Sequence, residues 1–289
     1  MDAEADHPLA LLLGVGKQNA PPWSPGPDPR SAQLPLIGQA WVLIVLVAAY
    51  LLAVAIGPRL MEKRQAWNVN HAMQIYNCGM TLLSLYMAVE LPMSGFSNNQ
   101  AVSCAPIGHD LAPSDYRVAR VIWLYFFSKI IEFADTIFMI VRKKNSQVTF
   151  LHVYHHASIA IVWWVVARWM PGGSSSYEPV LNCVVHVFMY AYYFLASLGD
   201  WIKPYLWWKC YLTQLQMVQF ATLILHSGLI AALNCGYPRN FAIFVMLYML
   251  SFLLLFYSFY NKCYSSCQSR HLVSAPTAAR STDNSYKNK

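Results

Sequence analysis

Residues 241–261 read FAIFVMLYMLSFLLLFYSFYN, an apolar stretch without Asp, Glu, Lys or Arg. A helix of about 20 apolar residues crosses the hydrocarbon core of a bilayer. Five further stretches lack these charged residues, namely 36–57, 72–89, 151–167, 180–199 and 211–233. None of them alternates apolar and polar residues as a membrane β-strand does, so each is predicted to be a transmembrane helix.

A seventh apolar segment, 118–141, carries Arg120, Lys129, Glu132 and Asp135. With it, the sequence predicts an all-α integral membrane protein with seven transmembrane helices. The composition agrees, since 57% of residues are hydrophobic and 11% are charged, against about 25% charged in soluble domains. This excludes a disordered protein and an ordinary cytosolic domain. Without a glycine-rich phosphate loop or a sustained basic face, nothing indicates nucleotide hydrolysis or nucleic-acid binding.

Three regions follow from this pattern: a proline-rich leader at 1–35 without fixed structure, a seven-helix domain at 36–261 and a flexible tail at 262–289. Lys and Arg in the predicted loops divide as thirteen on one side of the membrane and six on the other, with Lys129 inside it. Because basic loops stay in the cytosol, the N-terminus is predicted to be luminal or external and the C-terminus cytosolic.

Of seven cysteines, two alone fall in predicted non-cytosolic loops, where a disulfide can persist: Cys104 and Cys235. We predict that they pair; the alternative is two free thiols.

Polar residues recur at helical spacing within the predicted spans. Lys129, Glu132 and Asp135 are spaced i, i+3, i+6, and each would cost about 2.5–3.5 kcal/mol if it faced lipid at the membrane centre. They are therefore expected to turn inward, either as a functional group or as an ion-paired brace. The following span opens with three histidines on one stripe, His152, His155 and His156.

Two more rows follow on later spans, comprising Asn182, His186, Tyr190 and Tyr193, and then Thr213, Gln216 and Gln219. Each row alone could be hydrogen-bonding glue between helices. Together they predict an inward-facing polar chamber in a helical bundle, open at its histidine end toward the cytosol.

Clustered imidazoles suit metal binding, proton relay, or nucleophilic and acid–base catalysis. Only four of the nine histidines belong to this cluster, namely His152, His155, His156 and His186. Four imidazoles could hold one metal ion but are too few for the di-iron centre of membrane desaturases. We therefore assign no metal site.

The ordered motifs KxxExxDT (129–136), QxxFLHxYHH (147–156), NxxxHxxMYxYY (182–193) and TxxQxxQF (213–220) resemble the signature set of the fatty acid elongases of the endoplasmic reticulum, the ELO family. Tyr154, the ASI triplet at 157–159, the Trp pair at 163–164 and the segment 205–216 resemble the branch that acts on polyunsaturated chains.

The resemblance implies a 3-oxoacyl-CoA synthase, which condenses an acyl-CoA with malonyl-CoA and releases CO2 and CoA, with no cofactor. It implies catalytic residues in the polar rows: His155 as acyl acceptor, His152 and His156 as orienting and proton-moving groups, and His186 as a stabiliser of the carbonyl or enolate. Lys129, Glu132 and Asp135 would set the local field, and hydrogen bonds to substrate would come from Asn182, Tyr190, Tyr193, Gln216 and Gln219. Cysteine is the usual nucleophile in soluble condensing enzymes, and Cys183, three residues before His186 on the same helix face, is a rival nucleophile.

The cytosolic bases Lys143, Lys144, Lys203 and Lys209 either attract the CoA phosphates or only enforce topology. The resemblance further implies an endoplasmic reticulum membrane location and partnership with the ketoacyl-CoA reductase, dehydratase and enoyl-CoA reductase of an elongation cycle; homo-oligomerisation stays open. Two other classes remain: a seven-helix receptor or transporter, and a metal-dependent oxygenase with a histidine box.

Overall fold

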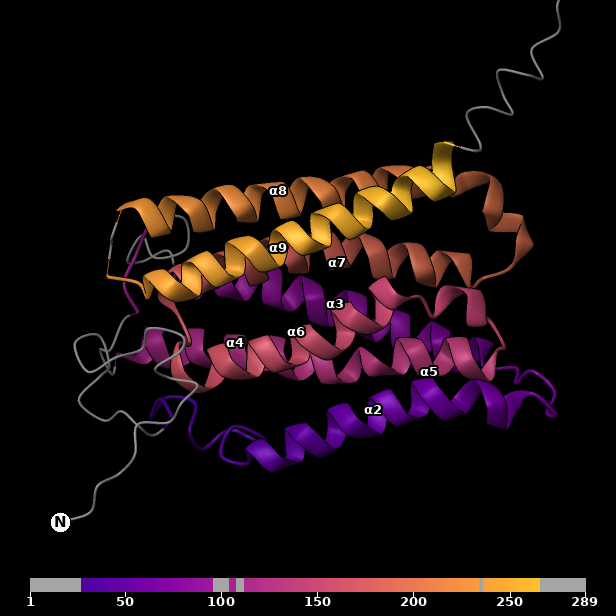
Figure 1. Ribbon diagram of the computed structural model, residues 1–289, viewed down its shortest axis with the longest axis horizontal. Coiled ribbons are helices and arrows are strands. Elements are labelled where there is room, and N and C mark those ends of the chain that lie inside the picture. Colours follow the sequence, from indigo (N-terminus) through magenta and orange to yellow (C-terminus); the bar gives the residue numbers. More distant parts are fainter. Residues whose placement is uncertain (1–26, 96–103, 108–111, 234–235, 266–289) are drawn as a thin grey trace, which may run out of the picture.

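The computed structural model describes residues 27–95, 104–107, 112–233 and 236–265, and Figure 1 shows them as a bundle of long helices. Over these residues the chain is helical and contains no strand. The α-helices are α2 (Ala40–Met61), α3 (Asn70–Gly95), α4 (Pro113–Ile131), α5 (Phe133–Val141), α6 (Phe150–Trp169), α7 (Tyr177–Ala196), α8 (Lys209–Leu233) and α9 (Arg239–Tyr260).

Short helical turns join several of these helices. Three of them are 3₁₀ turns, η2 (Asn145–Gln147), η3 (Gly173–Ser176) and η4 (Asp200–Tyr205). A π turn, η5 (Asn261–Ser265), follows α9. Glu132 alone separates α4 from α5, and its backbone stays in the right-handed helical region. The apolar segment at 118–141 is therefore one rod with a local break, which the sequence did not predict.

Five segments of the described chain are long and apolar enough to cross a membrane, namely Ala40–Met61, Phe150–Trp169, Gly173–Ala196, Lys209–Leu233 and Arg239–Cys263. This confirms an all-α protein with membrane-spanning helices. The α4 helix fails this measure because charged residues interrupt it, and α5 is only 9 residues long. The count of seven spans, which also needs α3 and the α4–α5 rod, stays a prediction.

Helix packing follows a closed order. The helices α3, α4, α6, α9, α8 and α7 each pack against the next, and α7 returns to pack against α3. The α2 helix lies outside this ring and packs on α5 and α6. Its buried residues Leu43, Val47 and Tyr50 are spaced i, i+4, i+7, which is one stripe of a helix. The rest of α2 exposes large apolar side chains, as a lipid-facing helix does.

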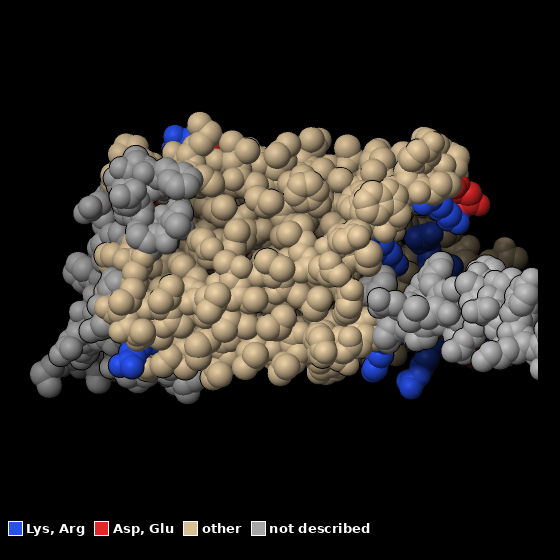
Figure 2. Space-filling view, turned by 90° about the horizontal axis from the view of Figure 1, so that it is seen from above, with Lys and Arg blue, Asp and Glu red and all other residues tan. Residues whose placement is uncertain are grey.

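The surface charge is concentrated at the ends of the bundle. In Figure 2 the flank is almost free of charged side chains, and Lys and Arg gather mainly at one end. That end holds the α2–α3, α5–α6 and α7–α8 connections and the end of α9. The segregation of basic residues to one end matches the predicted loops, and the side of the membrane that this end faces stays a prediction.

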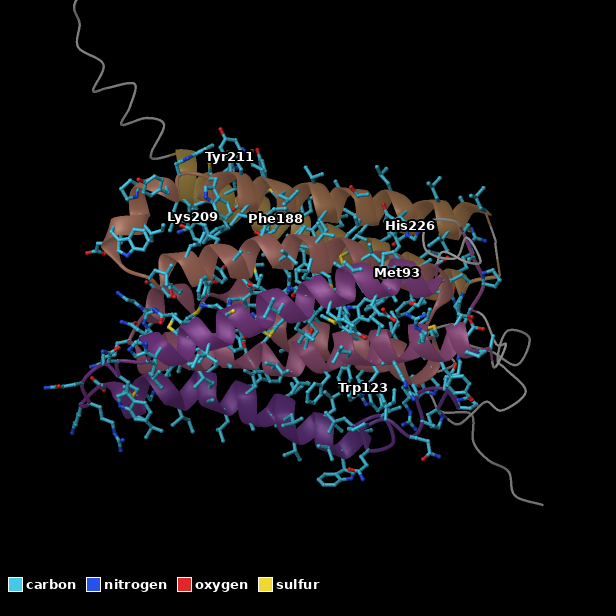
Figure 3. The ribbon with its side chains drawn as sticks, turned by 180° about the vertical axis from the view of Figure 1, so that it is seen from behind. Met93, Trp123, Phe188, Lys209, Tyr211 and His226 are labelled. Carbon is cyan, nitrogen blue, oxygen red and sulfur yellow. The ribbon has the colours of Figure 1, made fainter. Side chains whose placement is uncertain are left out.

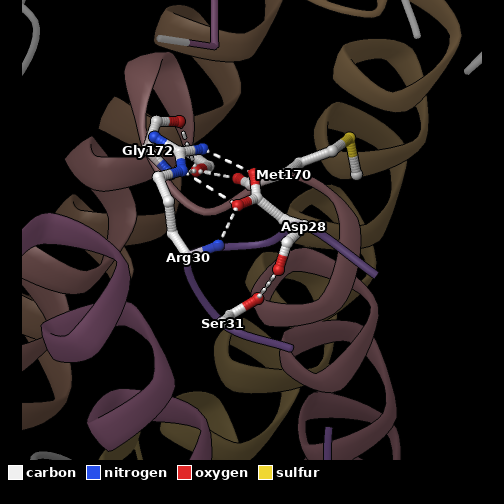
Figure 4. Close-up of polar contacts among 6 residues, drawn as sticks. Asp28, Arg30, Ser31, Met170 and Gly172 are labelled. Atoms are coloured by element: carbon white, nitrogen blue, oxygen red, sulfur yellow. Dashed lines mark hydrogen bonds and ion pairs between the residues drawn. The ribbon is translucent and has the colours of Figure 1, made fainter. Parts of the chain in front are cut away.

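The expectation that residues 1–35 lack fixed structure is wrong for their last part; residues 1–26 lie outside the described chain. Residues 27–39, the N-terminal arm, form successive turns against the bundle. Arg30 binds Asp28 through both carboxylate oxygens, at 2.9 and 2.6 Å, with each side chain almost fully buried. Figure 4 shows the pair beside the turn at Met170 and Gly172. The proline content of residues 27–35 predicted no fixed structure, but this buried bidentate ion pair holds their backbone in a defined conformation.

Three successive carbonyl groups hold the end of the arm. Trp123 Nε1 donates to Pro35 O at 2.8 Å, Trp164 Nε1 donates to Leu36 O at 2.9 Å, and Arg168 Nη1 donates to Ile37 O. The donors come from α4 and α6, so the arm ties these two helices together at the end away from the basic loops. Leu36 has a positive φ of 70°, a strained conformation for a side-chain-bearing residue.

Candidate functional site

The centre of the site is an ion pair at the break between α4 and α5. Lys129 Nζ lies 2.8 Å from Glu132 Oε1, and each side chain is 1% exposed. The ammonium also lies 4.3 Å from the centre of the Tyr125 ring. Charges buried this deeply persist only when they are paired and hydrogen-bonded, and both conditions are met for Lys129.

Helix α7 contributes partners to this pair from across the ring. Lys129 Nζ and the Tyr125 hydroxyl donate to Asn182 Oδ1 at 3.0 and 2.7 Å. His186 Nδ1 lies 3.5 Å from Glu132 Oε1. Because α3 separates α4 from α7 in the packing order, these contacts cross the interior of the ring. Two residues of the first predicted row and two of the third thus form one connected cluster, namely Lys129, Glu132, Asn182 and His186.

One oxygen of the cluster has no partner. Glu132 Oε2 is buried without a hydrogen bond from any described residue. An unsatisfied buried acceptor costs free energy, so this oxygen is available to a proton or a donor group of a ligand.

The histidine stripe begins in the first turn of α6, and Thr149 caps the N-terminus of this helix. Its hydroxyl accepts a hydrogen bond from the backbone N–H of His152 at 3.3 Å, a typical N-cap arrangement. His152 Nε2 lies 2.8 Å from the Thr136 hydroxyl, which is itself 3.1 Å from the Tyr50 hydroxyl of α2. This network fixes the orientation of the His152 ring.

The other two histidines of the stripe pack against one another. The His156 ring centre lies 4.4 Å from that of His152 and 5.0 Å from that of His155. His156 is buried, and its Nδ1 has no partner among the described residues. His155 packs on Phe252 of α9, with 5.3 Å between ring centres. No hydrogen bond among the described residues uses the His155 ring.

Asp135 and Tyr190 form a second link between the α4–α5 rod and α7. The Tyr190 hydroxyl donates to Asp135 Oδ2 at 2.8 Å, and Tyr190 is fully buried. Its ring also packs against His186, with 5.5 Å between centres. Tyr193, predicted to bind substrate, is 41% exposed and lies further along α7. It belongs to the rim of the cluster and not to its core.

The last predicted row, on α8, makes few contacts with the other rows. Gln219 and Thr213 are buried. Gln216 Nε2 lies 3.7 Å from Met189 Sδ of α7, a weak contact that leaves most of the amide's hydrogen-bonding capacity unused. In the described part of the chain, no hydrogen bond or ion pair joins this row to the Lys129–Glu132 pair. The first three rows are therefore connected to one another, and the row on α8 lies next to them.

The four lysines predicted to attract CoA phosphates differ in their surroundings. Lys143 has a positive φ of 58°, and its Nζ donates to the backbone carbonyls of Glu62 and Arg64 at 3.0 and 2.9 Å. Lys203 pairs with Asp200 at 2.6 Å on the surface. These two ammonium groups are already engaged within the protein. The remaining two, Lys144 and Lys209, are exposed.

Cys104 is disulfide-bonded. Its predicted partner Cys235 lies outside the described residues, so the identity of the pair stays a prediction. The rival nucleophile Cys183 is 1% exposed. Among the described residues, no group of three or more His, Cys, Asp or Glu side chains is placed to hold a metal ion.

Sequence reasoning missed several residues that complete the site. Tyr125 lies four residues before Lys129 on the same face of α4, and that spacing could have revealed it. On α6 and α9, the Tyr154 and Ser251 hydroxyls lie 3.1 Å apart, and those of Ser158 and Tyr248 lie 2.6 Å apart. These pairs join helices far apart in the sequence, and no local pattern indicates them.

The fold and the site define a class of protein: a helical membrane protein with an ion pair and a histidine stripe enclosed among its helices. Within this class, the chain belongs to the ELO (GNS1/SUR4) family, whose model matches residues 35–272.

Curated relatives agree with this assignment. The chain is 40% identical over 238 residues to the very long chain fatty acid elongase 4 of Mus musculus, covering 82% of this chain and 76% of that protein. It is 44% identical to the very long chain fatty acid elongase 2 of Rattus norvegicus, over 76% of this chain and 78% of that protein. It is 41% identical to the very long chain fatty acid elongase 5 of Rattus norvegicus, over 84% and 82%.

Proposed function

We propose that this protein condenses a long-chain, polyunsaturated acyl-CoA with malonyl-CoA, giving a 3-oxoacyl-CoA two carbons longer, CO2 and CoA. The contact of the Lys129–Glu132 pair with His186, together with the packed histidine stripe of α6, carries the proposal. The family supports fatty acid elongation. The polyunsaturated preference rests on the motif resemblance around Tyr154 alone.

In the first step, an imidazole nitrogen of His155 attacks the thioester carbonyl of the acyl-CoA. A nitrogen–carbon bond forms, the carbon–sulfur bond breaks, and CoA leaves as a thiolate that takes up a proton. His155 suits this role because its ring is not engaged in hydrogen bonds with the described residues, and an acyl-imidazole stays reactive toward a second nucleophile. His152, held by Thr136, and the adjacent His156 orient His155 and move protons.

In the second step, malonyl-CoA loses CO2, and the resulting carbanion attacks the acyl carbon. The new carbon–carbon bond forms as the bond to His155 breaks, which restores the imidazole. His186, Lys129 and Asn182 would stabilise the negative charge that develops on the thioester oxygen, since fixed donors act strongly in a water-poor site. Asp135, Tyr190, Tyr193, Gln216 and Gln219 complete the hydrogen-bonding surroundings. The two thioesters and these side chains supply the chemistry, without a further cofactor.

Seven spans, an inward polar chamber and a membrane of the endoplasmic reticulum complete the proposal. The N-terminus would be luminal, and the basic end of the bundle cytosolic, where Lys144 and Lys209 are free to meet the CoA phosphates. A 3-oxoacyl-CoA requires reduction, dehydration and a second reduction, so the ketoacyl-CoA reductase, dehydratase and enoyl-CoA reductase are the proposed partners.

The test is intact-mass measurement of purified protein incubated with an acyl-CoA alone. Wild type should gain the mass of one acyl group, and His155→Ala should gain none. His71→Ala, a matched change at an exposed residue of α3, should behave as wild type. Adducts at wild-type level on His155→Ala would transfer the role to another group.

Two further measurements separate the alternatives. Cys183→Ser should keep full activity; a loss of the adduct with this variant would favour the cysteine. With labelled malonyl-CoA and an acyl-CoA, wild type should release CO2. A protein that binds both thioesters, or neither, and releases no CO2 is not a condensing enzyme.

A further inference from the structure

A second polar site lies at the other end of the bundle from the basic loops. A partly enclosed cavity of about 30 Å³ opens there between α6, α7, α8 and α9, enough for about two water molecules. His226 and Lys209, both on α8, lie near opposite ends of the bundle in Figure 3. The residues with polar side-chain atoms that line the cavity are Trp163, Ser174, Ser175, Glu178, His226, Ser227 and Tyr237.

The cavity continues the stripes that carry the histidine site. On α6, Val162 and Val166 of the cavity wall follow His155 at i+7 and i+11, which places them on one helix face. On α9, Val245 of the wall precedes Phe252, the contact of His155, by seven residues. At 1.5 Å per residue, the wall at Val166 lies about 16 Å along α6 from His155. A chain attached at His155 and running along these faces therefore points into the cavity.

Helix α7 and one aromatic contact connect the two sites directly. Asn182 and Glu178 are four residues apart on α7, so the partner of Lys129 and the carboxyl of the cavity share a face. The Tyr125 hydroxyl binds Asn182, and the Tyr125 ring meets the Trp163 ring edge-on, with 4.6 Å between centres. Trp163 is 1% exposed and forms the cavity wall.

Two polar atoms that line this cavity lack a hydrogen bond, whereas the Ser174 and Ser175 hydroxyls are bonded to backbone groups of the protein. Trp163 Nε1 and His226 Nε2 are buried and make no hydrogen bond to any described residue. The Glu178 carboxyl faces the Trp163 indole N–H, and the Tyr177 ring stacks on the His226 imidazole, with 4.0 Å between ring centres. Each unpaired buried group destabilises the protein. The apolar end of a fatty chain offers no partner to an indole N–H, an imidazole nitrogen or a carboxyl group.

Resting on the proposed function, we propose that the cavity binds a hydroxyl group at the far end of the acyl chain, so that ω-hydroxyacyl-CoA thioesters are substrates. A hydroxyl group is both donor and acceptor. It can accept from Trp163 Nε1 while it donates to Glu178 or to His226 Nε2. The small volume suits one terminal group, and the apolar wall of α6 and α9 suits the methylene chain that leads to it.

The experiment compares acyl-CoA thioesters in pairs of equal length, with and without an ω-hydroxyl group, each given singly with malonyl-CoA to the purified full-length protein. The readout is the ratio of the two kcat/KM values, followed as CoA release and checked by product mass. We expect a ratio near 1 for short chains and about threefold to tenfold per hydrogen bond at the length that reaches the cavity. An ω-carboxyl chain of that length should be disfavoured, because two carboxyl groups that share one buried site cannot both ionise without a large cost.

Two variants tie the effect to the cavity. Trp163→Phe removes the N–H and keeps a ring, and Glu178→Gln removes the charge at nearly constant size. Each should reduce the ratio of kcat/KM for the ω-hydroxyl chain to kcat/KM for the unsubstituted chain. Glu178→Gln should also raise kcat/KM for the ω-carboxyl chain relative to the unsubstituted chain. Glu90→Gln makes the same chemical change where Glu90 pairs with Arg117, and should leave both ratios at wild-type values.

The outcomes separate the two proposals. A ratio at or below 1 for every length that wild type elongates, or a raised ratio that both cavity variants leave unchanged, overturns the cavity proposal alone. Failure of wild type to elongate any unsubstituted acyl-CoA overturns the proposed function instead.

Discussion

Lys129 and Glu132 form an ion pair within the bundle, with 2.8 Å between Nζ and Oε1. Removal of one partner from such a pair leaves an uncompensated buried charge, which costs about 3–5 kcal/mol. We expect Lys129→Met and Glu132→Gln each to lower the free energy of unfolding in detergent by this amount. The double variant should lose less than the sum of the two, because it leaves no unpaired charge. Additive losses would show that the two residues are not coupled.

Lys143 and Lys144 are adjacent but are expected to have separate roles. Lys143 holds the α2–α3 connection through the carbonyls of Glu62 and Arg64, so Lys143→Gln should lower the melting temperature. Lys144→Gln should leave stability unchanged and raise KM for the acyl-CoA up to about fivefold, the range of an exposed charge pair. The KM effect should shrink with added salt, because exposed charges are screened. A raised KM with unchanged stability in Lys143→Gln would reverse the assignment.

The Asp28–Arg30 pair is expected to stabilise the bundle although it precedes the residues that the family model matches. Arg30→Ala leaves the buried Asp28 carboxylate without its partner and should destabilise the protein by about 3–5 kcal/mol. Arg239→Ala, at the exposed start of α9, is the matched control and should change stability by less than about 0.5 kcal/mol. Equal melting temperatures for the two variants would mean that the arm contributes nothing.

The disulfide of Cys104 is expected to end at Cys235. Non-reducing peptide mapping by mass spectrometry should show one linked peptide that contains both residues. Loss of the bond in Cys104→Ser should destabilise the protein by about 2–4 kcal/mol. A free thiol at Cys235 in the non-reduced protein would refute the pairing.

Much of the architecture follows from hydrophobicity alone. The apolar stretches at 151–167 and 211–233 lie within α6 and α8, and the stretch at 241–261 lies within α9 except for its last residue. Helices are expected there because a lipid-facing backbone must satisfy its own hydrogen bonds. The inward placement of Lys129 and Glu132 follows from the same physics, since a charge that faces lipid is too costly. The spacing of polar residues along a helix, and the free-energy cost of exposing a charge to lipid, depend only on neighbouring residues. Both can therefore be read from the sequence.

Contacts between distant segments were beyond this reasoning. Nothing near Tyr125 indicates that it binds Asn182, and nothing in the proline-rich leader indicates that its last residues meet Trp164 and Arg168. Lys143 illustrates a different limit, because its charge predicted a phosphate contact, whereas its ammonium group donates to the backbone carbonyls of Glu62 and Arg64. Such outcomes depend on the three-dimensional path of the chain, which residue type and spacing do not encode.

The attachment of the N-terminal arm also governs how the protein can be engineered. The carbonyls of Pro35, Leu36 and Ile37 are each bound by a side chain of α4 or α6. An affinity tag or fluorescent reporter inserted between Asp28 and Ile37 would force these three anchors apart and splay α4 from α6. Fusions placed ahead of residue 27 spare every one of the anchors.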